Sequence, residues 1–303
     1  MSDAISLSDV TKRFNGVTAV DRLTLGVPAG SIYGFIGPNG SGKTTTLRMI
    51  MNILLPDEGR ISVLGSDTGD AARDRISYLP EERGLYKKMT VRRLLRYYGQ
   101  LKGRSVAQID PVVDDWMGRM GMEGWGDRKI ETLSKGMSQK VQFVAAVVSQ
   151  PELLILDEPF SGLDPVNAET LKDAVLEMRR RGATVVFSTH DMATAEKMCD
   201  RIFMIFRGRK VLDGTLEDIQ SQYGFDTVRL RTAGGAAALS GIAGVDAVND
   251  YGQLQEIRLS CDAQGFLRQL AARTAVHHFE ITRPSLHDIF VRIARPAEQE
   301  AVS

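Results

Sequence analysis

Short apolar runs separated by turn residues occupy the first 80 positions of the chain. Six of these runs predict strands, at 5–7, 17–20, 23–27, 32–36, 61–64 and 76–79. Apolar residues at helical spacing between Leu47 and Met51 predict a helix soon after the fourth strand. This part of the sequence therefore predicts a β-rich segment that leads into an α/β core.

The pattern becomes helical between Thr90 and Lys140. Thr90 suits the N-cap of the apolar and polar repeat that follows it, and Val112, Trp116 and Met120 recur at helical spacing in a second repeat. A stripe of aromatic and methionine side chains is typical of a hydrophobic core. We therefore predict a helical subdomain over about residues 85–140.

A βαβ unit is predicted in the next part of the chain. The continuous apolar run Leu153–Leu156 is typical of a parallel strand that is buried on both faces. A helical pattern at about 167–181 and the strand-like run Thr184–Ser188 complete the unit. A helix near 193–199 and a hairpin at 201–211 follow. The fold class predicted for this part is α/β.

The composition shifts near Tyr223, where a small α+β domain is predicted to begin. Its predicted strands and helices lie at 227–231, 255–259, 264–272, 276–281 and 286–293. Small residues at 232–238 predict a turn or loop, and the tail after residue 295 is expected to fray. The predicted domains are thus 1–222 and 223–303.

Composition and charge narrow the possibilities further. Lys plus Arg and Asp plus Glu each number 38 in 303 residues, so electrostatics gives no reason to expect nucleic acid as the main partner. Cys199 and Cys261 lack metal-ligand spacing and are expected to be small buried residues in a reducing compartment. The sequence contains neither a secretory signal pattern nor an uncharged apolar run near 18 residues. We expect a cytoplasmic chain, or one held at a membrane by a partner.

The most informative motif is the run Gly37–Thr45, GPNGSGKTT, which follows the predicted strand at 32–36 and precedes a helix. It matches G-x-x-x-x-G-K-[ST] in the strand–loop–helix setting that this pattern requires. Glycines let the backbone turn its N–H groups toward phosphates, Lys43 adds a point charge, and Thr44 offers a hydroxyl to Mg²⁺. Thr45, at the positive end of the helix, can donate to another phosphate oxygen. The motif predicts a nucleoside triphosphate site.

Two carboxylates, Asp157 and Glu158, follow the predicted buried strand at 153–156. In a phosphate-loop protein, the first would hold Mg²⁺ directly or through water, and the second would orient and deprotonate the attacking water. The simpler alternative is a strand end at which polar residues turn to solvent. The phosphate loop earlier in the chain favours the functional interpretation.

Three further segments carry polar residues at the ends of predicted elements. They are Ser161–Asp164, Ser188–Asp191 and Leu133–Gln139. His190 ends a strand of the βαβ unit, where ligands of parallel sheets bind, and an imidazole can contact a phosphate in its neutral or its charged form. Ser134, at a predicted helix start, fits either an anion site or an ordinary N-cap.

Together and in this order, the motifs resemble those of the ATP-binding subunits of ABC transporters, over residues 5 to about 215. The resemblance implies a P-loop NTPase fold of ABC type, with a β subdomain, a RecA-like core and a helical subdomain. It also implies hydrolysis of ATP with Mg²⁺. The run Leu79–Tyr86 and the appended domain are similar to the ABC-2 exporter branch, which includes sodium-extrusion and multidrug-export types.

The resemblance also implies a role for each matching residue. Phe14 would stack on adenine, Glu158 would act as general base and His190 would contact the γ-phosphate. Ser134 and Gly136 would belong to the family's signature motif, which closes over the ATP bound by a second subunit. Asp164 would lie along the seam between the two subunits. The implied site residues are Phe14, Gly37, Pro38, Asn39, Gly40, Ser41, Gly42, Lys43, Thr44, Thr45, Glu81, Ser134, Gly136, Asp157, Glu158, Asp164 and His190, with Thr44, Asp157 and Glu81 at the metal.

The sequence departs from the family pattern at two places. Leu133–Met137 reads LSKGM where LSGGQ is usual, so Lys135 adds a charge and Met137 cannot form the hydrogen bond of a glutamine. Glu81 stands where a metal-linked glutamine is usual, and it adds negative charge near the γ-phosphate. We expect slower or differently gated hydrolysis, but not its loss while Glu158 is present.

These observations favour an ATPase that powers a separate membrane permease, with export as the expected direction. It would act as a homodimer or pseudo-dimer on the inner face of the membrane, without nucleic acid.

The alternative is a soluble, non-transport ATPase of the same superfamily, although the chain has a single motif set and no heptads. A third hypothesis makes the C-terminal domain a ligand sensor. His277 and His278 could suggest a metal site in that domain, but adjacent side chains on a strand point to opposite faces, so a shared site is not expected. A packing or dimerisation module is the simpler interpretation.

Overall fold

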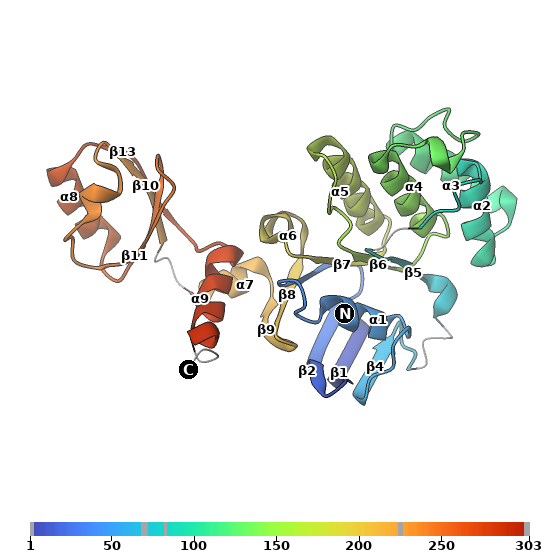
Figure 1. The fold of residues 1–303 in the computed structure, drawn as a ribbon, viewed down its shortest axis with the longest axis horizontal. Helices are drawn as coiled ribbons and strands as arrows, with labels where there is room; N and C mark the ends of the chain where they lie inside the picture. Colours follow the sequence, from blue (N-terminus) through green and yellow to red (C-terminus); the bar gives the residue numbers. More distant parts are fainter. Residues whose placement is uncertain (1–2, 68–71, 82–83, 224–226, 300–303) are drawn as a thin grey trace. The chain divides into compact units, whose positions relative to one another are not determined.

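A computed structural model of the protein describes residues 3–67, 72–81, 84–223 and 227–299. The chain divides into two compact units, Met1–Gly214 and Thr215–Ser303, each with its own hydrophobic core (Figure 1). Helix α7 (Leu216–Ser221) belongs to the second unit. The division between the units therefore lies before this helix, whereas the sequence analysis predicted it after residue 222.

A six-stranded sheet forms the centre of the first unit. Its order is β5 (Ile76–Leu79), β6 (Leu153–Asp157), β7 (Thr184–Thr189), β3 (Ile32–Ile36), β8 (Arg201–Phe206) and β9 (Arg209–Gly214). All neighbouring strands are parallel except β8 and β9, which form a hairpin. Positive φ values at Arg207 and Gly208 provide the turn that was expected there.

Both faces of this sheet are buried, which explains the uninterrupted apolar sequence of β6. Leu153 and Ile155 belong to one core cluster, whereas Leu154 and Leu156 belong to another on the opposite face. The predicted α/β fold and the predicted buried strand are therefore confirmed.

One face of the central sheet is covered by a β subdomain and helix α1 (Lys43–Ile50) (Figure 1). The subdomain is an antiparallel sheet of order β2 (Val17–Pro28), β1 (Asp3–Phe14) and β4 (Glu58–Val63). Side chains from these strands, from α1 and from the central sheet share one core cluster. This packing fixes the loop between β3 and α1, which contains the phosphate-loop motif.

The opposite face carries helices α2 (Val91–Leu101), α3 (Val106–Arg119), α4 (Lys135–Val147) and α5 (Pro165–Arg180) (Figure 1). Trp116 packs edge-on against Phe143 with ring centroids 5.7 Å apart, so the aromatic and methionine stripe is core, as predicted. The Thr90 side chain accepts a hydrogen bond from the Arg93 backbone N–H and caps α2. The remaining helices of this unit are η1 (Arg73–Arg75), η2 (Ile130–Thr132) and α6 (Met192–Met198).

The second unit is built on a four-stranded antiparallel sheet. Its order is β11 (Val245–Asp250), β12 (Gln255–Leu259), β10 (Thr227–Thr232) and β13 (Val276–Thr282). Helices η3 (Gly235–Leu239) and α8 (Ala263–Arg273) contribute to its core, and α9 (Leu286–Gln299) ends the described chain. The predicted small α+β domain is confirmed in architecture.

The structure differs from the sequence-based description in several details. Edge strand β11 was not predicted, because its residues are mostly exposed and show no apolar alternation. The predicted loop at 232–238 contains η3, and the tail expected to fray after 295 continues as α9 to Gln299. Cys261 is exposed rather than buried, and Cys199, in the first unit, is only partly buried.

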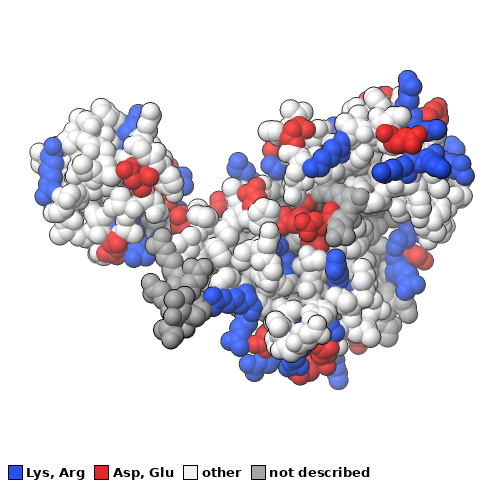
Figure 2. Space-filling view, in the orientation of Figure 1, with Lys and Arg blue, Asp and Glu red and all other residues white. Residues whose placement is uncertain are grey.

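Charged side chains of both signs appear on the face shown in Figure 2. Asp and Glu side chains gather near the middle of this view, and Lys and Arg side chains lie around them. In the described ranges, we find no helix with both the length and the apolar character needed to cross a membrane.

Candidate active site

The phosphate-loop motif lies where β3 turns into α1. Gly37 and Gly42 have φ values of 153° and 110°, which other residues rarely adopt. A Cβ atom would lie 2.3 Å from the Ile205 carbonyl oxygen at Gly37, and 2.6 Å from the Ala19 carbonyl oxygen at Gly42. The loop therefore needs glycine both for its conformation and for its close approach to β2 and β8.

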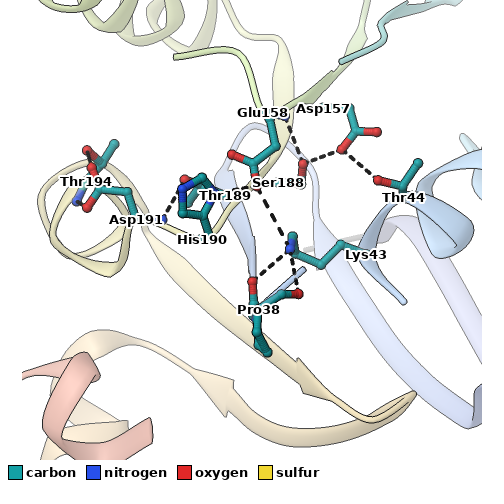
Figure 3. A network of polar contacts seen from close by, with 11 residues as sticks. Pro38, Lys43, Thr44, Asp157, Glu158, Ser188, Thr189, His190, Asp191 and Thr194 are labelled. Atoms are coloured by element: carbon teal, nitrogen blue, oxygen red, sulfur yellow. Dashed lines mark hydrogen bonds and ion pairs between the residues drawn. The ribbon is translucent and has the colours of Figure 1, made fainter. Parts of the chain in front are cut away.

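The Lys43 ammonium lies inside this loop, and the residue is 5% exposed (Figure 3). Its Nζ donates to the carbonyl oxygens of Gly37 at 2.7 Å and Pro38 at 3.0 Å, and lies 3.9 Å from Glu158 Oε1. Burial lowers the pKa of Lys43, an effect that the Glu158 and Asp157 carboxylates oppose. The loop thus encloses a cation whose own partners are two neutral carbonyls and a neighbouring carboxylate.

Asp157 ends β6, and its carboxylate receives hydroxyl groups from three different elements. Oδ1 accepts from Thr44 Oγ1 at 3.2 Å and from Ser188 Oγ at 2.5 Å (Figure 3). Oδ2 accepts from the Tyr78 hydroxyl at 3.5 Å. Burial and the Asp157 charge raise the pKa of Tyr78 to about 12, so this phenol remains a donor at neutral pH. The contacts hold the carboxylate beside the first turn of α1.

Glu158 leaves the sheet immediately after Asp157, with a left-handed φ of 47° that is uncommon for glutamate. Its Oε1 lies 3.0 Å from Nδ1 of His190, the residue that follows β7. The same oxygen faces Lys43 Nζ, so the carboxylate stands between two nitrogen groups, and Glu158 itself is 6% exposed. The backbone N–H of Asp191 donates to Thr189 Oγ1 and helps to fix the His190 turn.

A cavity of about 320 Å³ opens beside these residues. Its lining is made of Ala19, Asn39, Gly40, Gly42, Lys43, Thr44, Thr45, Glu81 and Glu158. Ser41 is buried in the same loop, and its hydroxyl has no hydrogen-bond partner among the described residues. Such an orphaned hydroxyl beside a buried ammonium and a helix N-terminus fits a phosphate chain.

The donor set also fits Mg²⁺. The cation prefers oxygen ligands and is usually held by one or two protein carboxylates or hydroxyls together with substrate phosphates. Thr44 Oγ1 and Asp157 Oδ1 lie side by side at 3.2 Å, and exposed Glu81 adds a carboxylate to the cavity lining. We find no group of three or more His, Cys, Asp or Glu side chains in the described ranges that would hold a metal by itself.

Ser134, Gly136 and Asp164 form a second cluster, which does not line this cavity. Ser134 caps α4 by accepting from the Met137 N–H, and Asp164 caps α5 by accepting from the Asn167 N–H. Asn167 joins the two helix starts. Its Nδ2 donates to Asp164 Oδ2 at 2.5 Å and would lie 2.6 Å from a Cβ at Gly136.

Two other sequence-predicted features also lie outside the cavity lining. Phe14 ends β1 with 43% exposure, and Lys12 Nζ lies 5.5 Å from the centroid of its ring. Lys135, the departure in the signature, lies against the loop before α5, where a Cβ at Gly162 would be 2.9 Å from its Nζ. The extra charge thus belongs to the cluster of helix starts and not to the phosphate loop.

Sequence reasoning assigned no role to two side chains of the site, Ser188 and Tyr78. Ser188 donates to Asp157 and also accepts from the Glu158 N–H at 3.0 Å. A usable signal existed for Ser188, because consecutive parallel strands end at one edge of the sheet and Ser188 stands two residues before His190. Tyr78 had no comparable signal, since its position beside Asp157 depends on the pairing of β5 with β6.

Comparisons with known proteins agree with this geometry. Residues 20–161 match the family described as "ABC transporter", and residues 214–294 match the family "ATP-binding protein DrrA1-3-like, C-terminal domain". An uncharacterized ABC transporter ATP-binding protein, YhaQ of Bacillus subtilis, is 38% identical over 289 residues, which are 95% of this chain and 97% of the relative. The daunorubicin/doxorubicin resistance ATP-binding protein DrrA of Streptomyces peucetius is 34% identical, over 98% of this chain and 94% of the relative.

A solved structure described as the ATP-binding subunit of an ABC transporter superposes with a TM-score of 0.68 and 33% identity, over 73% of this chain and 93% of that one. The phosphate loop, the two carboxylates at the carboxyl end of β6 and the similarity along nearly the whole chain lead to one conclusion. The chain belongs to the family of ABC transporter ATP-binding proteins, the subunits that hydrolyse ATP for transport.

Proposed function

We propose that this ATPase powers export through a separate membrane permease and hydrolyses Mg²⁺-bound ATP at the cavity beside Lys43. The placement of Glu158 carries the catalytic part of the proposal. Its Oε1 lies 3.0 Å from His190 Nδ1 and 3.9 Å from Lys43 Nζ, at a cavity lined by the first turn of α1. A carboxylate in that position can accept a proton from a water molecule next to a bound phosphate.

Each residue around the cavity has a distinct part in the proposal. Lys43, Ser41 and the loop amides bind phosphate oxygens, and Thr45 adds a hydroxyl at the helix start. Thr44 and Asp157 hold Mg²⁺, with Glu81 as a further carboxylate at the rim. The metal, when bound, neutralises phosphate charge. His190 orients the Glu158 carboxylate and reaches toward the terminal phosphate.

The second cluster supports a composite site that two subunits share. Ser134 and Asp164 cap neighbouring helices whose first turns contain no acidic residue, and Asn167 ties them together outside the cavity. Helix N-termini attract anions. We propose that this cluster, with Gly136, closes over ATP held by a second copy or a paralogous subunit, while Phe14 of the first copy stacks on adenine.

The proposed direction and location follow from named relatives. Nod factor export ATP-binding protein I of Burkholderia lata is 32% identical over 95% of this chain and 96% of its own length, and DrrA is named for drug resistance. Both similarities extend over the C-terminal unit. Shared ancestry of the nucleotide-binding unit alone would not explain this. We propose that the protein sits on the cytoplasmic face of the membrane through its permease.

Replacement of Glu158 by glutamine tests the catalytic assignment. ATP turnover is expected to fall by about 100-fold or more, because general-base catalysis contributes about 10²–10⁴ to a rate. ATP affinity should change little, and size-exclusion chromatography should show an ATP-dependent dimer. Glu152→Gln is the matched control. Glu152 immediately precedes β6, at the end of the strand far from Glu158, and pairs with Arg75 on the surface. Unchanged turnover of Glu158→Gln would refute the assignment of the base.

The transport assignment needs a separate measurement. The membrane protein that co-purifies with this chain should stimulate its ATP turnover when both are reconstituted in vesicles. With the ATPase on the outside, vesicles are expected to accumulate the exported compound only when ATP is supplied. Stimulation without any accumulation in this orientation, but with release of preloaded compound, would contradict export.

A further inference from the structure

The hydroxyl of Ser188 joins the two carboxylate residues of the active site. It donates to Asp157 Oδ1 at 2.5 Å and accepts from the backbone N–H of Glu158 at 3.0 Å (Figure 3). Ser188 is fully buried, and the partner atoms come from consecutive residues at the end of β6. One side chain on β7 therefore contacts both the proposed metal ligand and the proposed general base.

The position of Ser188 follows from the register of the central sheet. The ladder between β6 and β7 ends at the pair Asp157–Ser188, after which Glu158 turns away with a φ of 47°. This turn removes the Glu158 N–H from the ladder, and the Ser188 hydroxyl accepts its hydrogen bond instead. The uncommon backbone conformation of Glu158 is thus supported by a side chain and not by strand pairing.

The single hydroxyl proton gives this arrangement a direction. Because Ser188 Oγ accepts from an N–H that can only donate, its own proton is directed to Asp157 Oδ1. That oxygen also accepts from Thr44, so the Ser188 bond fixes which face of the carboxylate is turned toward α1. A hydrogen bond to an ionised carboxylate is about twice as strong as one between neutral groups.

We propose that Ser188 is a positioning residue of the ATPase reaction, which sets the Asp157 carboxylate and the Glu158 backbone in one geometry. The proposal rests on the proposed roles of Asp157 at Mg²⁺ and Glu158 as base. Ser188 contacts neither water nor phosphate in this scheme, and it acts through its two neighbours. A shift of the Asp157 carboxylate would therefore move the Ser188 hydroxyl, and with it the Glu158 backbone N–H that donates to this hydroxyl.

The test compares Ser188→Ala and Ser188→Thr in the full-length protein. Alanine removes both hydrogen bonds, whereas threonine keeps a hydroxyl at the same position. Ser77→Ala is the matched control, because Ser77 is a buried serine on β5 of the same sheet and its hydroxyl contacts Ser149, away from the site. The readouts are kcat, the affinity for ATP, the Mg²⁺ concentration for half-maximal turnover and the thermal midpoint.

Ser188→Ala is expected to lower kcat by about 10–100-fold, the range for a lost hydrogen bond to a charged group. ATP affinity should stay within about threefold, because the lining of the phosphate loop is unchanged, and the half-maximal Mg²⁺ concentration should rise. Ser188→Thr should recover most of the turnover, and Ser77→Ala should match the parent. If the alanine variant does not fold, Ser188→Cys, with its weak donor, is expected to fold and to show the same losses.

The proposal is overturned if Ser188→Ala keeps kcat within about twofold of the parent with an unchanged Mg²⁺ requirement. It is also overturned if threonine fails to recover turnover in a folded protein, because then packing and not the hydroxyl is responsible. Failure of the proposed function is a distinct result, since Glu158→Gln would then remain active. An inactive Glu158→Gln together with a fully active Ser188→Ala would reject the role of Ser188 alone.

Discussion

Gly34 lies in the middle of β3, and the thiol of Cys199 occupies the space where a side chain would stand. A Cβ at Gly34 would be 2.5 Å from Cys199 Sγ and 3.9 Å from the Ala195 Cβ, both of which lie at the α6 side of the strand. Ordinary contacts begin at 3.4 Å, so the thiol would have to retreat by about 1 Å. Pairing with β7 and β8 prevents β3 itself from moving aside.

Gly34→Ala should therefore destabilise the first unit by about 1–3 kcal/mol, the usual cost of overpacking a core. In urea, the unfolding midpoint should fall without a change in slope, and the thermal midpoint should fall by about 2–4 °C for each kcal/mol. Tryptophan fluorescence is a suitable probe, because the chain has two tryptophans, Trp116 and Trp125, and both lie in the first unit.

A second substitution separates this steric explanation from a general effect on β3. Cys199→Ala removes the thiol and should leave room for the new methyl group, so Gly34→Ala should cost less than about 0.5 kcal/mol in that background. The expected coupling between the two sites is about 1 kcal/mol or more. An equal cost of Gly34→Ala in both backgrounds would refute the reasoning, as would a stable single variant.

Three further predictions concern other parts of the chain. Cys261 should react with a thiol reagent before Cys199, because burial raises the pKa of the Cys199 thiol and lowers its thiolate fraction; mass spectrometry of timed samples gives the order, and equal rates would contradict it. The Arg96 hydrogen bonds lower the pKa of Asp110, so its stabilising contribution is present above the unfolded-state pKa near 3.9 and is lost as the pH falls through the lower folded-state pKa. Asp110→Asn should cost less than about 1 kcal/mol near pH 7 and progressively less below about pH 4 in urea titrations, and a constant difference would count against this ion pair. Ser134→Ala should destabilise the protein by about 1 kcal/mol through loss of the α4 cap, with little change in ATP affinity of the single subunit; calorimetric binding that falls in parallel with stability would contradict a purely capping role in the monomer.

The parts of the fold that the sequence predicted well are those set by local pattern. The phosphate loop combines glycines that the backbone requires with a lysine and two threonines at a helix start, so its geometry is encoded within one short segment. The strand that ends at Asp157 was equally clear, because burial on both faces demands a continuous apolar run.

The parts that it did not predict depend on pairing between distant segments. Ser188 reaches Asp157 only through the register of β6 with β7, and Tyr78 reaches it only through the register of β5 with β6. Edge strand β11 is defined by its hydrogen bonds to β12, while its exposed side chains carry no apolar pattern. The exposure of Cys261 likewise depends on how the second unit packs.

The strand order of the central sheet has a consequence for synthesis of the protein. Strand β3 precedes the phosphate loop early in the chain, yet its two partners, β7 and β8, lie near the end of the first unit. At a translation rate of about 5–20 residues per second, β3 leaves the ribosome on the order of ten seconds before either partner exists. A buried, apolar strand is thus exposed during that interval, and the nucleotide site is completed only when nearly the whole first unit has been made. ATP can therefore stabilise the finished unit but cannot guide the assembly of its earliest strands.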